Sequence, residues 1–225
     1  MGYVVKASNV SISYGPAKVI DSASFSIEDG DFVCIVGANG SGKTTLVRSL
    51  LGLIKPISGK ITFGPGITKQ SIGFLPQDAI SDFNFPATVF EVVMSGNLGH
   101  LGIKPFYQKP DKARALTALN QLGIAKLRTA SFSQLSGGQK QKVLLARALT
   151  ATSKILILDE PSNNLDYKSR QEFYHTLQEL NSTGLTIIMI TYDLDTKDLI
   201  GNKIISISNT KVECTTTDNF LARFK

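Results

Sequence analysis

One stretch of eight residues limits the possible folds of this chain more than any other. Residues 37–44 read GANGSGKT and match the pattern G-x-x-x-x-G-K-[ST] at every fixed position. An apolar run, FVCIV, precedes the stretch, and apolar residues at helical spacing follow it. A strand, a glycine-rich turn and a helix in this order form a loop whose backbone N–H groups surround a phosphate. The stretch therefore predicts an α/β fold with a phosphate-binding loop.

Each residue type in this loop has a physical role. The glycines let the backbone curl, and the N-terminus of the next helix adds the positive end of its dipole. Lys43 brings a full charge to the β- and γ-phosphates, and the Thr44 hydroxyl can be a ligand of Mg²⁺. The alternative is a glycine-rich turn without a ligand. The predicted nucleotide contacts are Gly37, Asn39, Gly40, Ser41, Gly42, Lys43, Thr44 and Thr45.

A second apolar run ends in two carboxylates, because residues 155–160 read ILILDE. Neighbouring residues of a strand point to opposite sides, so Asp159 and Glu160 should have different tasks. We expect Asp159 to hold Mg²⁺ through water and Glu160 to polarise an attacking water molecule. Such a pair is weak evidence alone, but it is strong beside GANGSGKT.

The hydrophobic pattern predicts how the chain is organised. Strands are expected at 3–14, 22–37 (with a turn at Gly30), 59–64, 71–77, 154–159, 186–191, 203–208 and 211–214. Helices are expected after Gly42 and at 88–96, 112–123, 136–150 and 167–181. Alternating strands and helices favour a parallel sheet covered by helices, and the all-helical middle reads as an insertion into it. Predicted buried stripes are Leu116, Leu119 and Leu122, and Phe173, Leu177 and Leu180.

Composition excludes several other classes. No run approaches the ~18 apolar residues of a membrane span, and residues 1–10 lack the pattern of a signal peptide. The two cysteines, Cys34 and Cys214, form neither a disulfide framework nor a zinc site, and Cys34 should be a small buried side chain. His100 and His175 are isolated. The Lys and Arg residues behind the net charge of +6 are scattered along the sequence, so the charge does not by itself indicate a class of partner.

Residues 135–139 read LSGGQ and are followed by KQKVLLARAL. Ser136 is a plausible N-cap, and the glycines offer free amides at a helix start, although an ordinary helix start would look the same. Together with GANGSGKTT and ILILDE in this order, LSGGQ resembles the nucleotide-binding domain of ATP-binding-cassette (ABC) transporters. The resemblance covers essentially the whole chain. It implies a P-loop NTPase core with a parallel sheet, an N-terminal antiparallel β subdomain and an α-helical insertion at roughly 86–150, all within one domain of residues 1–225.

The resemblance also implies site residues and partners. Tyr14 would stack on the adenine of ATP, although it could also be a core tyrosine. Gln77 would sense Mg²⁺ and link to the membrane subunit. Residues 162–166 would cross a dimer interface, where Asp166 could also simply cap the next helix. Two domains would sandwich ATP between the loop of one and the LSGGQ of the other, so Ser136, Gly137, Gly138 and Gln139 join the predicted nucleotide contacts.

The expected partners are thus a second copy or a second ABC subunit, an integral membrane permease and a solute-binding protein, with no nucleic acid. The expected location is the cytoplasmic face of the cell membrane. Residues 82–96, DFNFPATVFEVVMSG, resemble the corresponding segment of manganese, zinc and iron importers, although any ABC domain needs an apolar helix there. The rival classes are translation factors, which carry two cassettes in one chain, and chromosome or repair ATPases, which carry long coiled coils.

The sequence departs from the family pattern at one position. The strand at 186–191 is normally followed by a histidine and an aspartate, but here residues 191–193 read Thr-Tyr-Asp. A phenol with a pKa of ~10 stays neutral at pH 7 and lacks the second ring nitrogen of imidazole. Tyr192 therefore predicts slow hydrolysis with intact ATP binding. The rival interpretation is that its hydroxyl, or a water molecule, replaces the histidine.

Overall fold

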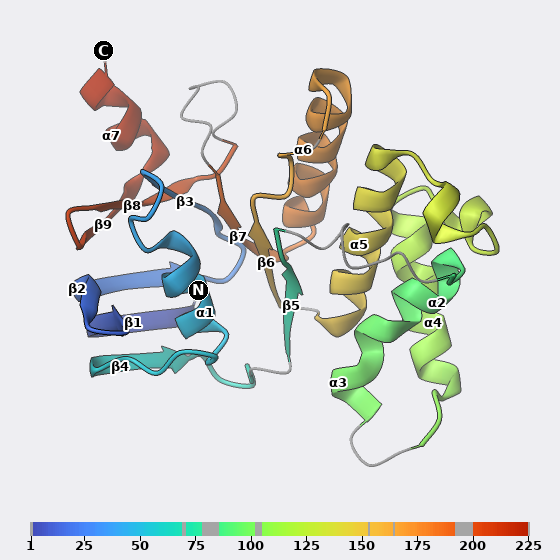
Figure 1. Cartoon of the computed structure of the whole chain (residues 1–225), viewed down its shortest axis with the longest axis horizontal. Coiled ribbons are helices and arrows are strands. Elements are labelled where there is room, and N and C mark those ends of the chain that lie inside the picture. Colours follow the sequence, from blue (N-terminus) through green and yellow to red (C-terminus); the bar gives the residue numbers. More distant parts are fainter. Residues whose placement is uncertain are drawn as a thin grey trace. The chain divides into compact units, whose positions relative to one another are not determined.

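The computed structural model describes residues 2–68, 71–77, 86–101, 105–152, 154–163, 165–191 and 200–224. The chain divides into two compact units, and Figure 1 labels the helices and strands that they contain. The first unit comprises Met1–Lys69 and Leu180–Lys225, and the second comprises Gln70–Glu179.

The first unit contains an antiparallel sheet of three strands with the order β2-β1-β4. These strands are β1 (Tyr3–Tyr14), β2 (Ala17–Glu28) and β4 (Ser58–Phe63). Alternate residues of β2 face the core, and Ala23, Phe25 and Ile27 are all buried, as the period of two predicts. The N-terminal antiparallel subdomain is therefore confirmed.

The same unit contains parallel strands around β3 (Phe32–Gly37). Strand β3 pairs in parallel with β7 (Thr186–Ile190) and with β8 (Lys203–Ser208), and β8 pairs antiparallel with β9 (Lys211–Thr216). All residues of β7 are buried, as expected for a central parallel strand. Helix α1 (Lys43–Leu50) follows β3, and α7 (Thr217–Leu221) follows β9. The strand, loop and helix that the motif requires are thus in place.

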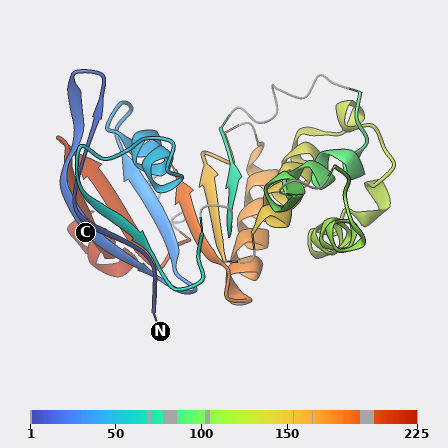
Figure 2. The same ribbon diagram turned by 90° about the horizontal axis from the view of Figure 1, so that it is seen from below.

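The second unit contains two parallel strands and most of the helices. Strand β5 (Ile72–Leu75) pairs in parallel with β6 (Ile155–Asp159). Helices α2 (Val89–Met94), α3 (Leu98–Leu101), α4 (Lys109–Gln121) and α5 (Gly137–Ala151) lie together in Figure 2. Helix α6 (Tyr167–Ser182) belongs to this unit as far as Glu179, and it buries Phe173, Leu177 and Leu180, so its predicted stripe is confirmed.

Two predictions about this unit need correction. Leu116 is 38% exposed, because the buried face of α4 is made by Ala115, Ala118, Leu119 and Leu122, and Leu116 lies about 100° away from it. Helix α4 also begins at Lys109, before the predicted residue 112. A capping box between Gln108 and Asp111 and a proline in the first turn set this start.

Among the described residues, no helix has the length and apolar character needed to cross a membrane. The prediction that residues 1–225 act as a single domain stays a prediction.

Candidate functional site

The loop between β3 and α1 has a backbone conformation that favours glycine at two positions. Gly40 and Gly42 have φ angles of 76° and 104°, in the region that favours glycine. A Cβ atom on Gly42 would lie 3.2 Å from the carbonyl oxygen of Val19. Gly42 is also the N-cap of α1, and no side chain caps the helix there. The first N–H groups of α1 are therefore available to an anion.

Lys43 is the charged group of this loop. Its side chain is only 4% exposed, and its Nζ donates hydrogen bonds to the carbonyl oxygens of Gly37 at 2.8 Å and Ala38 at 3.0 Å. The Ser41 hydroxyl is buried and has no hydrogen-bond partner within the described part of the chain. A buried cation beside a buried hydroxyl at a helix N-terminus is a favourable environment for a phosphate.

A cavity of about 300 Å³ extends from this loop toward the end of β1. Tyr14, at that end, is 65% exposed, so it is not a core tyrosine and its ring is accessible for stacking. The motif did not predict Val19 and Arg48, which also line the cavity, because they carry no recognisable pattern. The full lining is Tyr14, Val19, Gly40, Ser41, Gly42, Lys43, Thr44, Thr45 and Arg48.

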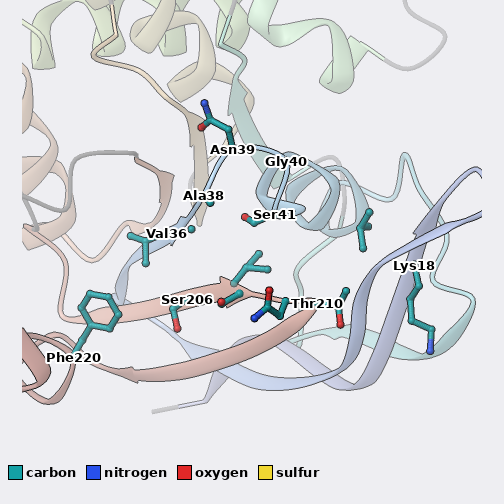
Figure 3. Close-up of a pocket in the computed structure, with 14 residues that line it drawn as sticks. Lys18, Val36, Ala38, Asn39, Gly40, Ser41, Ser206, Thr210 and Phe220 are labelled. Atoms are coloured by element: carbon teal, nitrogen blue, oxygen red, sulfur yellow. The ribbon is translucent and has the colours of Figure 1, made fainter.

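A larger cavity of about 640 Å³ lies along residues 36–41 as well, between them and the end of β8 (Figure 3). The Asn39 side chain points away from Ser206 and Thr210 in this view. Sequence reasoning placed Gly37 and Asn39 at the nucleotide, and both line this second cavity and not the first. Residues 206–210 were not predicted, since no motif marks them.

The predicted acid pair lies at the end of β6, in the second unit. Asp159 and Glu160 are 3% and 4% exposed. Strand β6 ends at Asp159, and Glu160 has a φ of 50°, in the left-handed region. Strand alternation therefore does not apply to Glu160, which lies in a turn after the strand, and the different tasks expected of the two carboxylates stay a prediction.

Two amide groups hold the Glu160 carboxylate. Nε2 of Gln77 donates a 2.6 Å hydrogen bond to Oε2 of Glu160, and Nδ2 of Asn163 donates to the same oxygen. The predicted residues Gln77 and Glu160 are thus in direct contact. Asn163 belongs to the segment that was predicted to cross a dimer interface, but its bond to Glu160 was not predicted.

The LSGGQ segment forms the start of α5. Ser136 is the N-cap, as expected: its hydroxyl accepts a bond from the backbone N–H of Gln139, and Oε1 of Gln139 accepts one from the N–H of Ser136. Ser136 and Gly137 are exposed. A cavity of about 140 Å³ lies beside them, and its lining includes Gly138 and Gln139. Gln139 has a structural task in addition to any contact with a nucleotide.

Asp166 acts as the predicted helix cap. Its carboxylate accepts hydrogen bonds from the backbone N–H of Ser169 at 3.0 Å and from the Ser169 hydroxyl at 2.7 Å. These two bonds hold the pKa of Asp166 below its usual value, the backbone bond contributing most.

Tyr192 and residues 82–85 lie outside the described residues. Among the residues that are described, no group of three or more His, Cys, Asp or Glu side chains could hold a metal ion. The donors predicted for Mg²⁺ are one carboxylate, one hydroxyl and one amide oxygen, from Asp159, Thr44 and Gln77. Each of these groups is a hard oxygen donor of the kind that Mg²⁺ prefers, and Asp159 is expected to act through water.

Known proteins resemble the chain over most of its length. A protein named "Probable metal transport system ATP-binding protein" from Chlamydia muridarum is 44% identical over 190 residues, which cover 83% of this chain and 80% of that protein. A manganese transport system ATP-binding protein from Synechocystis is 34% identical over 84% of this chain and 75% of that protein.

The fold has close counterparts too. The structure of cbiO1 from Clostridium perfringens, part of the ABC transporter complex cbiONQ, matches with a TM-score of 0.85 and 28% identity. The match covers 100% of this chain and 92% of that one. The sequence profile of the family described as "ABC transporter" matches residues 20–163. On this evidence of sequence and fold, the chain belongs to the ABC transporter family.

Proposed function

We propose that the chain is the ATP-binding and ATP-hydrolysing subunit that powers transport of a metal ion through a separate membrane permease. The observation that carries the ATPase part is the cavity that joins the buried ammonium of Lys43 and the uncapped N-terminus of α1 to the exposed ring of Tyr14. The names of the relatives support the metal ion.

ATP binding follows from the groups around this cavity. The phosphates would replace the carbonyl oxygens of Gly37 and Ala38 as partners of Lys43, so a buried cation gains anionic partners. The Ser41 hydroxyl and the first N–H groups of α1 add donors. Adenine stacking on Tyr14 would contribute ~1–3 kcal/mol, as for bases on aromatic side chains elsewhere.

Thr44, Asp159 and Gln77 would hold Mg²⁺, together with phosphate and water oxygens. The ion would neutralise charge on the transferred phosphoryl group. Glu160 would polarise the water that attacks the γ-phosphate, and the backbone turn together with the two amide donors would fix its carboxylate.

Assembly completes the site in this proposal. Ser136, Gly137, Gly138 and Gln139 would contact the γ-phosphate held by Lys43 of a second copy, or of a second ABC subunit. The exposure of Ser136 and Gly137 at the start of α5 supports this role, since a helix N-terminus attracts a phosphate. ATP would then stabilise the dimer, and hydrolysis would release it.

The remaining partners follow from the family. The chain would sit on the cytoplasmic face of the membrane, bound to a permease, with a solute-binding protein delivering the metal ion. No nucleic acid is involved. The resemblance of residues 82–96 to metal importers supports import.

Tyr192 bears on the rate. The phenol would supply at most one neutral donor where the family has a histidine, so we propose that the enzyme hydrolyses ATP slowly while binding it normally.

A metal-uptake experiment tests the proposal. Cells that express the chain together with a candidate partner permease should accumulate radioactive manganese or zinc, and the same cells carrying Lys43→Ala should not. A matched control is Lys60→Ala, which removes an exposed lysine from β4. Equal uptake with and without Lys43, or co-purification with ribosomes or DNA in place of a membrane protein, would contradict the transport role.

A further inference from the structure

The backbone of Glu160 adopts a conformation that other contacts must maintain. Its φ of 50° lies in the left-handed region, where a residue with a Cβ atom is strained. The next residue is Pro161, which has no N–H to fix the turn by donating a hydrogen bond. The carbonyl oxygen is therefore the only backbone group of Pro161 that can accept or donate a hydrogen bond to fix this segment.

Gln141 holds that oxygen. Its side chain is 6% exposed, and its Nε2 donates a 2.6 Å hydrogen bond to the carbonyl oxygen of Pro161. Pro161 is buried as well. Because each partner would be a buried polar group without the other, losing this bond costs more than losing one at the surface.

The segment is also fixed from α6. The hydroxyl groups of Ser162 and Tyr174 lie 2.9 Å apart in a buried hydrogen bond. The residues directly after Glu160 are therefore tied to α5 through Gln141 and to α6 through Ser162.

Helix α5 links the hydrogen bond of Gln141 to the exposed start of the same helix. The helix starts with the capping box of Ser136 and Gln139, and Gln141 follows two residues later on the same helix. A helix of 15 residues moves as a unit over such a short distance. One helical turn and one hydrogen bond therefore connect the exposed start of α5 to the backbone beside Glu160.

We propose that Gln141 is a positioning residue for hydrolysis. By holding the carbonyl of Pro161, it keeps the Glu160 carboxylate where it can polarise water, and it ties that carboxylate to the helix start that faces ATP. The inference rests on the role of Glu160 given under the proposed function. Gln141 acts through the backbone, and it leaves ATP binding to the loop at residues 37–45.

The test compares Gln141→Met, which keeps the length of the side chain but removes the donor, with Gln121→Met, which changes an exposed glutamine at the end of α4. We expect Gln141→Met to lower kcat about 10–100-fold, as loss of a group that orients a reacting residue does. The KM for ATP, and the affinity for a fluorescent ATP analogue, should stay within about twofold of wild type. Gln121→Met should change neither. If Gln141→Met does not fold, as judged by the absence of a cooperative unfolding transition, Gln141→Glu replaces it in the comparison. Glutamate has the same shape as glutamine and, when it is ionised, cannot donate the hydrogen bond.

Single-turnover hydrolysis in the Glu160→Gln background separates the possible roles. If Gln141 acts through Glu160, adding Gln141→Met should leave the residual rate unchanged. A wild-type kcat for Gln141→Met, or an equal fall in both backgrounds, would overturn the proposal. Wild-type hydrolysis by Glu160→Gln alone would instead show that the proposed role of Glu160 is wrong.

Discussion

The side-chain amide of Gln77 donates a 2.6 Å hydrogen bond to the carboxylate of Glu160. Gln77 follows strand β5 and Glu160 follows strand β6, and these two strands are paired in parallel. Both residues therefore lie at the same edge of the sheet, where parallel strands present their carboxyl ends. Gln77, which is expected to sense Mg²⁺ and to link to the membrane subunit, is thus in direct contact with Glu160, which is proposed to polarise water.

Replacing Lys43 tests the phosphate loop. Lys43→Ala removes a buried ammonium, and loss of hydrogen bonds from a charged group typically costs ~1.5–3 kcal/mol, so the affinity for Mg-ATP should fall about tenfold or more. A titration with a fluorescent ATP analogue measures this, with Lys60→Ala as the control. Equal affinities for Lys43→Ala and wild type would show that the loop does not bind phosphate.

The two cysteines should differ in reactivity. Burial raises the pKa of the Cys34 thiol to about 12, although a bond from the Gly201 backbone opposes the shift. Burial also raises the pKa of Cys214, but that side chain is only half-buried. At pH 8 the thiolate fraction of Cys34 is therefore very small, and reagents do not reach it.

An aromatic disulfide reagent should thus label only Cys214 rapidly in the folded protein and both cysteines after denaturation. The labelling rate of Cys214 should rise with pH as its thiolate forms. Rapid reaction of both thiols in the folded protein would contradict the burial of β3.

Much of this architecture was readable from the sequence, for identifiable reasons. The loop at 37–44 and the cap at Ser136 were predictable because only a few residue types permit such local geometry. The stripe of α6 followed from the helical period. Leu116 was wrongly predicted to be buried. Leucines at a spacing of three residues fit a helical stripe as well as the observed buried face does, and only tertiary packing shows which of the two is buried.

The contacts at Glu160 were beyond sequence reasoning. The strand predicted at 154–159 does end at Asp159, but nothing in the letters ILILDEPS shows that Glu160 turns into the left-handed region. The bonds from Gln77, Asn163 and Gln141 join residues brought together by the fold, and no local pattern records them.

Restoring the family residue at position 192 tests the account of the rate. Losing one donor to a developing charge typically costs ~2.7–4 kcal/mol, or ~100–1000-fold in rate. Tyr192→His should therefore raise kcat at least several-fold and leave ATP affinity nearly unchanged, whereas Tyr3→His, elsewhere on the chain, should have no effect on either. Steady-state phosphate release measures both variants. An unchanged or lower rate for folded Tyr192→His would show that the phenol is already competent.

Trapping ATP tests the dimer. Glu160→Gln keeps the size of the side chain and its ability to accept a hydrogen bond, but it removes the charge that polarises water. At high protein concentration and saturating ATP, this variant should sediment as a dimer, and adding Ser136→Glu should return it to a monomer by placing a negative charge against the γ-phosphate. Light scattering that shows only monomer for Glu160→Gln would contradict the sandwich.

The central claim is that Glu160 drives hydrolysis of ATP that the phosphate loop has bound, and release of phosphate from Mg-ATP tests it most directly. Wild-type protein should release phosphate, and Glu160→Gln should release it at least about 100-fold more slowly while binding ATP as tightly, because only the step of water attack is impaired. Phosphate release by Glu160→Gln at the wild-type rate, with ATP binding intact in both proteins, would contradict the account.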